Sequence, residues 1–450
     1  MPGVAPKSAA AADWFGQPRG LTILFLTEMW EKFSFYGMRS LLVLYMTKHL
    51  AIAQQNASWI YGTYAASVYV TPVFGGLIAD RWLGRRYAVI VGGLTMAAGH
   101  FMMASESLFY AALATIAIGS GLYLPSLPSQ IDSLYTHDDP RRKSAYNVYY
   151  VGINLGAFAA PLVVGTVGES YSFHWGFAIA GFGMFVGLMT YLAGARYLPP
   201  ETPRMPNLSA ATGEEGTPDN GLVQRFAFLV GIAAIVVIFR GAYEQFGNTM
   251  ALWADQSVDR TVTATLSIPV TWFQSLNPLL IFLLTPLLVM RWTRQARQGR
   301  ELPSGTKMSI GATIVGFSYL FVAATAFWSQ QHAVRVHWPC MVIFIVAMTA
   351  GELYILPVGL GLFGRLAPKG LTATTIAVWF SAGTLGNLFA GWLGTLWSPV
   401  SHGIFFSIIG AVALTAALLL ALVAPTVISV ERSVCVSGLT HRVHCRPSTS

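Results

Sequence analysis

The sequence predicts an all-α membrane protein with twelve transmembrane helices in two six-helix bundles around a central cavity. Of its 450 residues, 54% are hydrophobic and only 10% are charged, whereas a soluble domain carries about 25% charged residues. Twelve apolar segments are each near or above the length that crosses about 30 Å of hydrocarbon. A polar stretch separates six of them from the other six, which is typical of paired repeats around a shared cavity.

The predicted spans follow one another with short loops between them. They cover residues 21–47, 57–80, 87–105, 108–128, 145–166, 174–195, 226–250, 271–290, 308–329, 336–363, 371–396 and 402–424. We therefore expect a cytoplasmic N-terminus (1–20), a first bundle (21–198), a cytoplasmic linker (199–225), a second bundle (226–424) and a disordered cytoplasmic tail (425–450).

The loop charges predict the orientation. Of the 27 Lys and Arg residues, 21 lie in the N-terminus, the even-numbered loops and the tail, and only Lys48, Arg260 and Arg335 lie in the opposite loops. The positive-inside rule then places both termini in the cytoplasm of a multi-pass protein of the cell (inner) membrane. Because the bases lie in short loops, the net charge of +8 does not indicate nucleic-acid binding.

The cysteines and histidines predict neither a disulfide framework nor a metal site. Three cysteines are too few and too scattered for a framework. The tail carries Cys435, His441, His444 and Cys445, but their spacing is not a usual zinc spacing.

The first apolar run is too long for a signal peptide, so we expect insertion through the first helix.

A stripe of charges in span 21–47 is the strongest functional signal. At 100° per residue, Glu28, Glu31, Lys32 and Arg39 fall within about 100° of one another. Each charge costs roughly 2.5–3.5 kcal/mol in a membrane helix, so the stripe should face protein or a water-filled cavity. It predicts a path for a polar solute.

The loop after span 57–80 reads GGLIADRWLGRR and resembles the signature loop of the major facilitator superfamily. Its glycines allow a tight turn, and its acid and bases can cap helix ends. The resemblance implies a gating loop formed by Gly76, Asp80, Arg81, Gly84, Arg85 and Arg86.

Motifs along the chain resemble those of one family in that superfamily, the proton-dependent oligopeptide (POT) transporters. Residues 28–37 read EMWEKFSFYG, which is similar to the family's ExxERFxYYG. Further segments follow in family order: YVGINLG (150–156), YEQ (243–245), WFQSLNP (272–278), GELYILPVGL (351–360) and WF (379–380). Several motifs in order are more specific than any single one.

The resemblance fails at two positions in span 108–128. The family shows GxGxxKPN there, whereas this chain has Leu124 for the lysine and Ser126 for the asparagine. In the family that lysine lies in the peptide site and takes part in proton coupling. Arg240 stands where an aromatic residue is more usual, four residues before Glu244. Either Arg240 replaces the missing cation, or it only pairs with Glu244.

The resemblance implies roles for individual residues. The proton-coupling set is Glu28, Glu31, Lys32 and Glu244, and Arg39 and Glu244 form a salt bridge between the bundles. Substrate-binding residues are Lys32, Phe35, Tyr36, Arg39, Tyr69, Asn154, Arg240, Glu244, Asn277, Glu352 and Trp379. Structural alternatives stay open for several of these: packing for Trp379 and Tyr69, a kink for Asn277, and close helix packing for Asn154.

The resemblance therefore implies a secondary active transporter that couples inward proton movement to uptake of di- and tripeptides. We expect no enzyme activity and no cofactor beyond protons, because no nucleophile–base pairing is evident. The expected partners are small peptides and the lipid bilayer, with a monomer as the functional unit. Two alternatives are a transporter of another small zwitterionic or polar solute and a transport-inactive peptide sensor.

Overall fold

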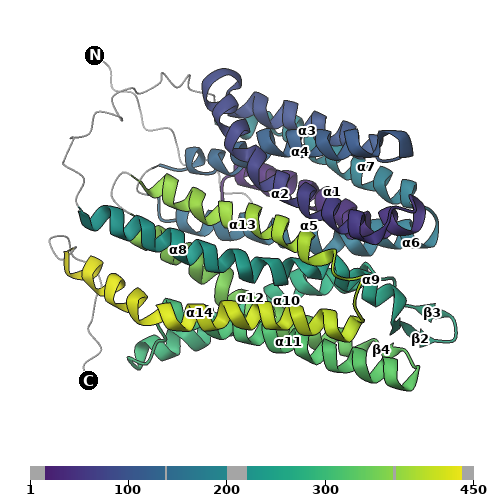
Figure 1. The fold of residues 1–450 in the computed structure, drawn as a ribbon. Helices are drawn as coiled ribbons and strands as arrows, with labels where there is room; N and C mark the ends of the chain where they lie inside the picture. Colours follow the sequence, from purple (N-terminus) through teal and green to yellow (C-terminus); the bar gives the residue numbers. More distant parts are fainter. Residues whose placement is uncertain (1–15, 137–138, 200–219, 368–370, 438–450) are drawn as a thin grey trace, which may run out of the picture. The chain divides into compact units, whose positions relative to one another are not determined.

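The protein is almost entirely helical in the computed structural model, which describes residues 16–136, 139–199, 220–367 and 371–437 (Figure 1). The N-terminus before residue 16, residues 200–219 of the predicted linker and the tail from residue 438 lie outside the described residues. The tail residues His441, His444 and Cys445 and the side chain of Cys435 also lie outside the described residues. The expectation that the tail holds no metal therefore stays a prediction.

The first half of the chain contains seven of the labelled α-helices. They are α1 (Arg19–Leu44), α2 (Gln54–Ile78), α3 (Arg85–Met102), α4 (Phe109–Ser126), α5 (Arg142–Ala160), α6 (Thr166–Ser170) and α7 (Phe173–Ala193). π-helical turns over Tyr45–His49, Ala79–Leu83 and Pro161–Gly165 extend α1, α2 and α5.

Within its described residues, the second half contains the other seven α-helices and four very short strands. The helices are α8 (Asn220–Tyr243), α9 (Thr249–Gln256), α10 (Trp272–Arg297), α11 (Ser304–His332), α12 (Pro339–Leu366), α13 (Thr372–Gly394) and α14 (His402–Ser437). Strand β1 (Val258–Asp259) pairs in parallel with β4 (Val336–His337), and β2 (Thr261–Thr263) pairs antiparallel with β3 (Leu266–Ser267).

Every predicted span overlaps a helix, which confirms the all-α membrane fold. Within the described residues, nine helical segments are long and apolar enough to cross a bilayer, and all of them lie after α3. Helix α1 differs from them because it carries the four charged residues of the stripe. The total of twelve transmembrane helices stays a prediction for α1, α2 and α3.

Backbone proximity groups the chain into two compact units. The first unit comprises Met1–Leu41 and Val70–Leu208, and the second comprises Leu42–Tyr69 and Ser209–Ser450. The sequence assigns residues 42–69 to the first bundle, whereas these residues pack with the C-terminal helices. These residues group with the second unit because Lys48 and Ser58 bind Asp255 and Asn248 directly.

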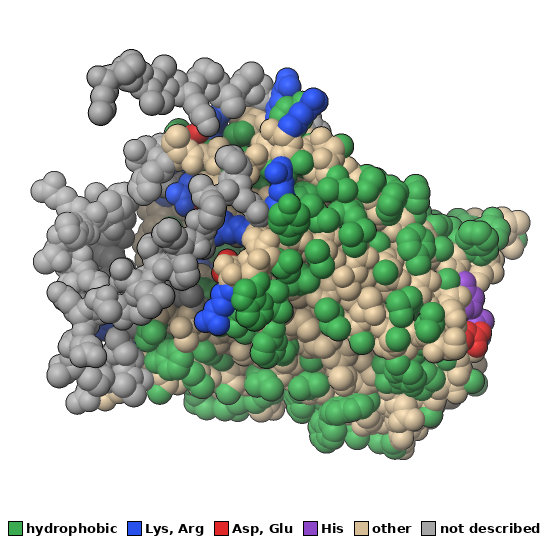
Figure 2. All heavy atoms as spheres, turned by 90° about the horizontal axis from the view of Figure 1, so that it is seen from above, with side chains coloured by type: hydrophobic (Ala, Val, Ile, Leu, Met, Phe, Trp, Pro, Cys, Tyr) green, Lys and Arg blue, Asp and Glu red, His purple; other side chains and the backbone are tan. Residues whose placement is uncertain are grey.

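The first unit is held by a core of large apolar side chains from α1, α3, α4, α5 and α7. Its members include Leu21, Leu24, Met96, Tyr123, Tyr149, Met184 and Tyr191. Outside this core, many apolar side chains are exposed, among them Phe74, Leu94, Ile118 and Phe182. Figure 2 shows a face on which hydrophobic and uncharged atoms cover a broad area, with Lys and Arg side chains gathered toward one side. Such exposure suits contact with lipid rather than water.

In the second unit, α14 lies beside α11 along much of its length (Figure 1). At 1.5 Å per residue its 36 residues span about 54 Å, well beyond the hydrocarbon thickness. Near its end, the Glu431 carboxylate accepts a hydrogen bond from the Ser304 hydroxyl (2.9 Å) and pairs with Arg365 (3.2 Å). The tail was expected to be disordered from residue 425, but α14 continues without a break to Ser437.

Candidate functional site

The charged stripe of α1 forms a compact cluster in the first unit. The Lys32 ammonium lies 3.2 Å from Glu28 Oε1 and 2.7 Å from Glu31 Oε2. Both glutamates are almost fully buried, with 3% and 1% of their surface exposed. One cation therefore serves two carboxylates, and the cluster carries one excess negative charge when all three groups are ionised. Such an imbalance is costly in a low-dielectric site.

Two tyrosines from neighbouring helices complete this cluster. Tyr123 of α4 and Tyr149 of α5 lie close enough to Glu28 to interact with it electrostatically. The second oxygen of Glu28, Oε2, is buried and has no hydrogen-bond partner among the residues that the structure describes. The sequence analysis missed both tyrosines, although Tyr149 immediately precedes the YVGINLG segment.

Close packing of α5 on α1 brings Tyr149 to the stripe. A Cβ atom at Gly156 would lie 2.1 Å from the carbonyl oxygen of Met29, so only glycine fits there. Two residues earlier on α5, the Asn154 side chain is buried, and its amide donates to the Tyr150 carbonyl (2.9 Å). The contact at Gly156 supports the helix-packing alternative for the segment, and the substrate-binding role of Asn154 stays a prediction.

Three further predicted residues of α1 follow the cluster. Tyr36 interacts electrostatically with Lys32, and its ring meets that of Phe35 edge to face at 5.2 Å. Arg39 is half-buried. Because Arg39 and Glu244 belong to different units, the salt bridge predicted between them stays a prediction.

Helix α4 offers no cation at the position of the family lysine. Leu124 is a half-buried apolar side chain, and the Ser126 hydroxyl donates to the Leu122 carbonyl at 2.7 Å within its own helix. Positive charge near the Glu28–Glu31 pair therefore comes from Lys32 of α1 and not from α4.

A second cluster lies in the second unit, where α8 ends. Arg240 pairs with Glu244 one turn later (2.9 Å), and both side chains are largely buried. The Arg240 guanidinium also lies 3.5 Å from the Tyr69 hydroxyl and 5.6 Å above the centre of the Tyr69 ring. Arg240 is thus held by an acid, a phenol and a π-face together. The pairing with Glu244 exists, and the role of Arg240 as a replacement cation stays a prediction.

Glu352 of α12 is the second buried acid of the second unit that the sequence singles out, after Glu244. Its Oε2 accepts a hydrogen bond from the Asn277 amide (2.7 Å), and the same amide also reaches the Thr349 hydroxyl (3.0 Å). Tyr243 lies close enough to Glu352 to interact electrostatically. Asn277 thereby orients Glu352, while α10 continues through Pro278. The sequence analysis missed Thr349 and Tyr243.

Trp379 of α13 is packed inside the second unit. Only 5% of its surface is exposed, and its ring lies 5.1 Å from that of Phe363. Gly359 of α12 makes room for it, since a Cβ there would lie 2.1 Å from the indole. This geometry supports the packing alternative, and the role of Trp379 as a ligand wall stays a prediction.

The predicted gating loop connects helices of the first unit. Gly84 has a φ of +76°, a conformation that favours glycine. After it, Arg85 donates to the Ser129 carbonyl (2.9 Å) and Arg86 to the Ala195 carbonyl. These bonds attach the start of α3 to the segments that follow α4 and α7. Asp80 and Arg81 are exposed. A Cβ atom at Gly76 of α2 would lie at an ordinary contact distance from Pro125.

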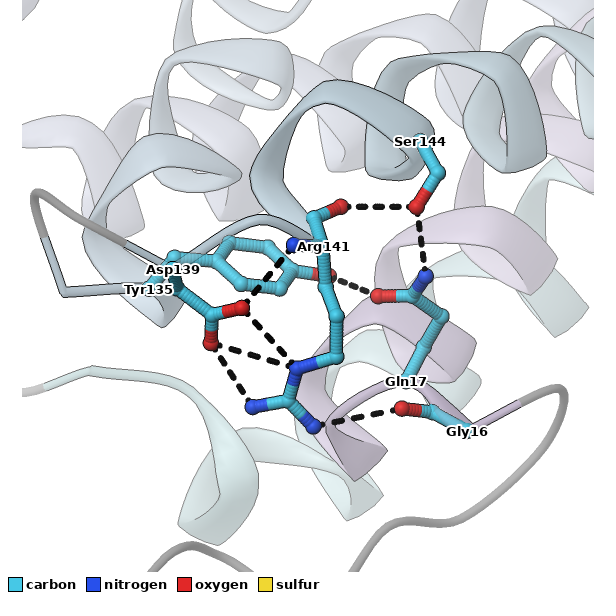
Figure 3. Close-up of polar contacts among 6 residues, drawn as sticks. All are labelled: Gly16, Gln17, Tyr135, Asp139, Arg141 and Ser144. Carbon is cyan, nitrogen blue, oxygen red and sulfur yellow. Dashed lines mark hydrogen bonds and ion pairs between the residues drawn. The ribbon is translucent and has the colours of Figure 1, made fainter.

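The start of α1 is fastened to the loop before α5, as Figure 3 shows. The Gln17 amide donates to the Ser144 hydroxyl (2.9 Å), and the Tyr135 hydroxyl donates to the Gln17 side-chain oxygen (2.7 Å). Arg141 bonds both Asp139 oxygens and the Gly16 carbonyl. Hydrogen bonds from Arg141 hold the pKa of the Asp139 carboxyl below its usual range.

The π-helical turn that follows α1, and the first part of α2, contact residues of the second unit instead. The Lys48 ammonium lies 2.7 Å from Asp255, and the Ser58 hydroxyl donates to the Asn248 side-chain oxygen at 3.0 Å. Further along α2 the backbone meets α13 directly. A Cβ at Gly62 would lie 2.5 Å from the Cα atom of Gly391. The two ends of α1 are therefore attached to different units.

Comparison with known proteins supports a single family. A family model described as the POT family matches residues 86–212 and 223–408. The chain is 31% identical to the peptide transporter YePEPT of Yersinia enterocolitica, covering 85% of this chain and 88% of that protein. Two crystal structures are similar in fold. One is a peptide transporter POT in complex with sulfate, with a TM-score of 0.86 and 29% identity over 94% of this chain and 98% of that chain. The other is a POT family transporter in complex with 5-aminolevulinic acid, with a TM-score of 0.84 and 25% identity over 93% of this chain and 99% of that chain. They confirm the predicted fold class.

Proposed function

Since the chain belongs to the POT family, we propose that it is a secondary active transporter that carries di- and tripeptides into the cell together with protons. Alternating access of a polar cavity to the two sides of the membrane moves the substrate. The proton is the coupling ion, and no other cofactor takes part. The protein acts as a monomer in the inner membrane, with both termini in the cytoplasm.

The observation that carries this proposal is the pair of buried carboxylates served by one ammonium. Glu28 and Glu31 share Lys32, so one proton would balance the charge of the cluster. Two close acids in a buried site titrate as a coupled pair, and their shared proton responds to small changes in surroundings. A conformational change that alters the water around Lys32 therefore changes the proton affinity of the pair.

The second unit supplies the complementary charges for a peptide. Glu352, oriented by Asn277, binds the substrate amine by a charge-assisted hydrogen bond. Arg240, held by Tyr69 and Glu244, binds the substrate carboxylate. We propose substrate contacts also for Lys32, Phe35, Tyr36, Arg39, Asn154 and Trp379, as the family resemblance implies.

In this proposal Arg240 replaces the cation that α4 lacks. The family's lysine position is the apolar Leu124, so Arg240 supplies the positive charge in its place. Leu124→Lys in an Arg240→Ala background should restore transport that Arg240→Ala abolishes. A folded double variant that remains inactive would show instead that Arg240 serves only Glu244.

Alternating access requires that the contacts of residues 42–69 with the C-terminal helices break and re-form. Those contacts include Lys48 with Asp255, Ser58 with Asn248, Gly62 against Gly391 and Tyr69 with Arg240. Breaking them would leave α1 attached at its start, through Gln17, to the first unit. Protonation of Glu244, or binding of a substrate carboxylate, would release a bridge from Arg39 and favour this step.

A second candidate is transport of another small zwitterion. The absence of a cation at Leu124 favours it, and a related POT family transporter has been crystallised with 5-aminolevulinic acid. A transport-inactive peptide sensor is the third candidate, and uptake into proteoliposomes distinguishes it from the other two.

Uptake into proteoliposomes tests the proposal. Labelled dialanine should accumulate when the outside is more acidic, and unlabelled tripeptides should compete while single amino acids should not. Accumulation of 5-aminolevulinic acid without competition by peptides would favour the second candidate. Binding of dialanine without accumulation would favour a sensor.

A further inference from the structure

Helix α10 exposes an apolar face that ends in arginines. Only 17% of its most apolar stretch is buried inside the protein, against 39% or more in the other eight candidate spans of the described residues. Leu283, Leu287 and Met290 are 53%, 62% and 68% exposed. This face is therefore open to the acyl chains of surrounding lipid.

The arginines continue the same face along the helix axis. At 100° per residue, Leu283, Leu287, Met290, Arg294 and Arg297 fall within an arc of about 80°. The three apolar side chains come first and the two arginines follow within about 11 Å along the axis. Arg291 lies about 40° outside the arc, and Arg300 follows the end of the helix. All four arginines are exposed.

The opposite side of α10 is packed against the protein, which fixes the direction of the arginine face. Trp292 lies roughly 180° from the centre of the arc. Its ring meets that of Tyr354 of α12 at 5.3 Å, and the Lys307 ammonium of α11 lies 4.5 Å from its centre. The arginine face therefore points away from α11 and α12.

The nearby acids are already paired. Glu301, the acid nearest in sequence, binds Lys307 at 2.7 Å, and Glu431 binds Arg365 at 3.2 Å. The four arginines form no ion pair within the described part of the chain. The surface thus combines an apolar strip with uncompensated guanidinium groups, which bind phosphate oxygens in bidentate fashion.

We propose that this face of α10 binds an anionic phospholipid. The acyl chains lie along Leu283, Leu287 and Met290, and the phosphate of the headgroup meets Arg294 and Arg297, with Arg291 beside them. Clusters of basic residues directly beyond a transmembrane helix attract anionic lipid by about 1 kcal/mol for each residue, which is about fivefold in affinity.

Native mass spectrometry of the full chain in detergent tests the proposal, with phosphatidylglycerol and phosphatidylcholine of matched acyl chains as probes. The wild type should bind phosphatidylglycerol at least tenfold more tightly. Arg294→Gln should lower that affinity about fivefold, and the triple variant Arg291→Gln/Arg294→Gln/Arg297→Gln should lose the preference. A triple Lys variant should retain most of it, because the charge remains.

Two controls make the result specific. Arg141→Gln/Arg142→Gln removes arginines that are already paired with Asp139 and Asp132, and should leave lipid preference unchanged. Millimolar glycerol 1-phosphate should not compete, because it lacks the acyl chains. Equal binding of both lipids by the wild type, an unchanged preference in Arg294→Gln, or full competition by glycerol 1-phosphate would overturn the proposal.

Discussion

Replacing Glu31 by Gln changes the charge of the α1 cluster by a defined amount. In the wild type, two buried carboxylates share the Lys32 ammonium at 3.2 and 2.7 Å. In Glu31→Gln, Glu28 and Lys32 remain as a balanced pair, and the excess negative charge that favours a proton is gone. The variant should therefore fold and bind substrate but lose coupling.

The size of the effect follows from the driving force. One proton per peptide and a gradient of one pH unit supply about 1.4 kcal/mol, which corresponds to about tenfold accumulation. The wild type should approach this ratio in proteoliposomes that are acidic outside. Glu31→Gln should stop at equal concentrations inside and outside, while exchange of labelled for unlabelled peptide continues.

Lys32→Ala is the contrasting variant. It removes the shared cation and leaves two buried carboxylates facing each other, which typically costs 3–5 kcal/mol. Its melting temperature should fall clearly, whereas that of Glu31→Gln should change little.

Tenfold accumulation by both Glu28→Gln and Glu31→Gln would refute the assignment of the coupling proton to this cluster.

Three further predictions concern single positions. Asn277→Ala removes the donor that orients Glu352, so the KM for peptides should rise about tenfold, as one charge-assisted hydrogen bond is worth about 1.5–3 kcal/mol; an unchanged KM would contradict this role. Gly62→Val places a side chain against Gly391, so uptake should fall to background while purified protein still binds peptide; normal uptake would show that the two backbones separate without cost. Gly84→Val forces a β-branched residue to positive φ and should destabilise the protein by about 1–3 kcal/mol, measured as a lower melting temperature.

The sequence predicts features that depend on spacing along one helix. The α1 charges share a face, Arg240 and Glu244 pair one turn apart, and Gly84 adopts the positive φ that its turn requires. Helix periodicity fixes the first two, and the tight turn before α3 fixes the third, without knowledge of neighbouring elements. The apolar spans are predictable for the same reason, because hydrocarbon thickness sets their length.

Features that depend on which helices are neighbours could not be predicted. Tyr123 and Tyr149 reach the α1 acids only because α4 and α5 pack against α1, and Thr349 reaches Asn277 only because α12 packs on α10. The grouping of residues 42–69 with the C-terminal helices likewise depends on contacts between distant segments. For Trp379, sequence pattern alone does not distinguish a packed indole from one that lines a cavity.

The long α14 has a practical consequence for imaging. At 48.7 kDa the chain is small for single-particle cryo-electron microscopy, where a protein buried in a micelle gives little signal for alignment. Because Ser304 and Arg365 hold Glu431 at the projecting end of this helix, a folded domain fused in unbroken helix there would keep a fixed orientation. Such a fusion would serve as a fiducial marker while leaving the charged helices of both units untouched.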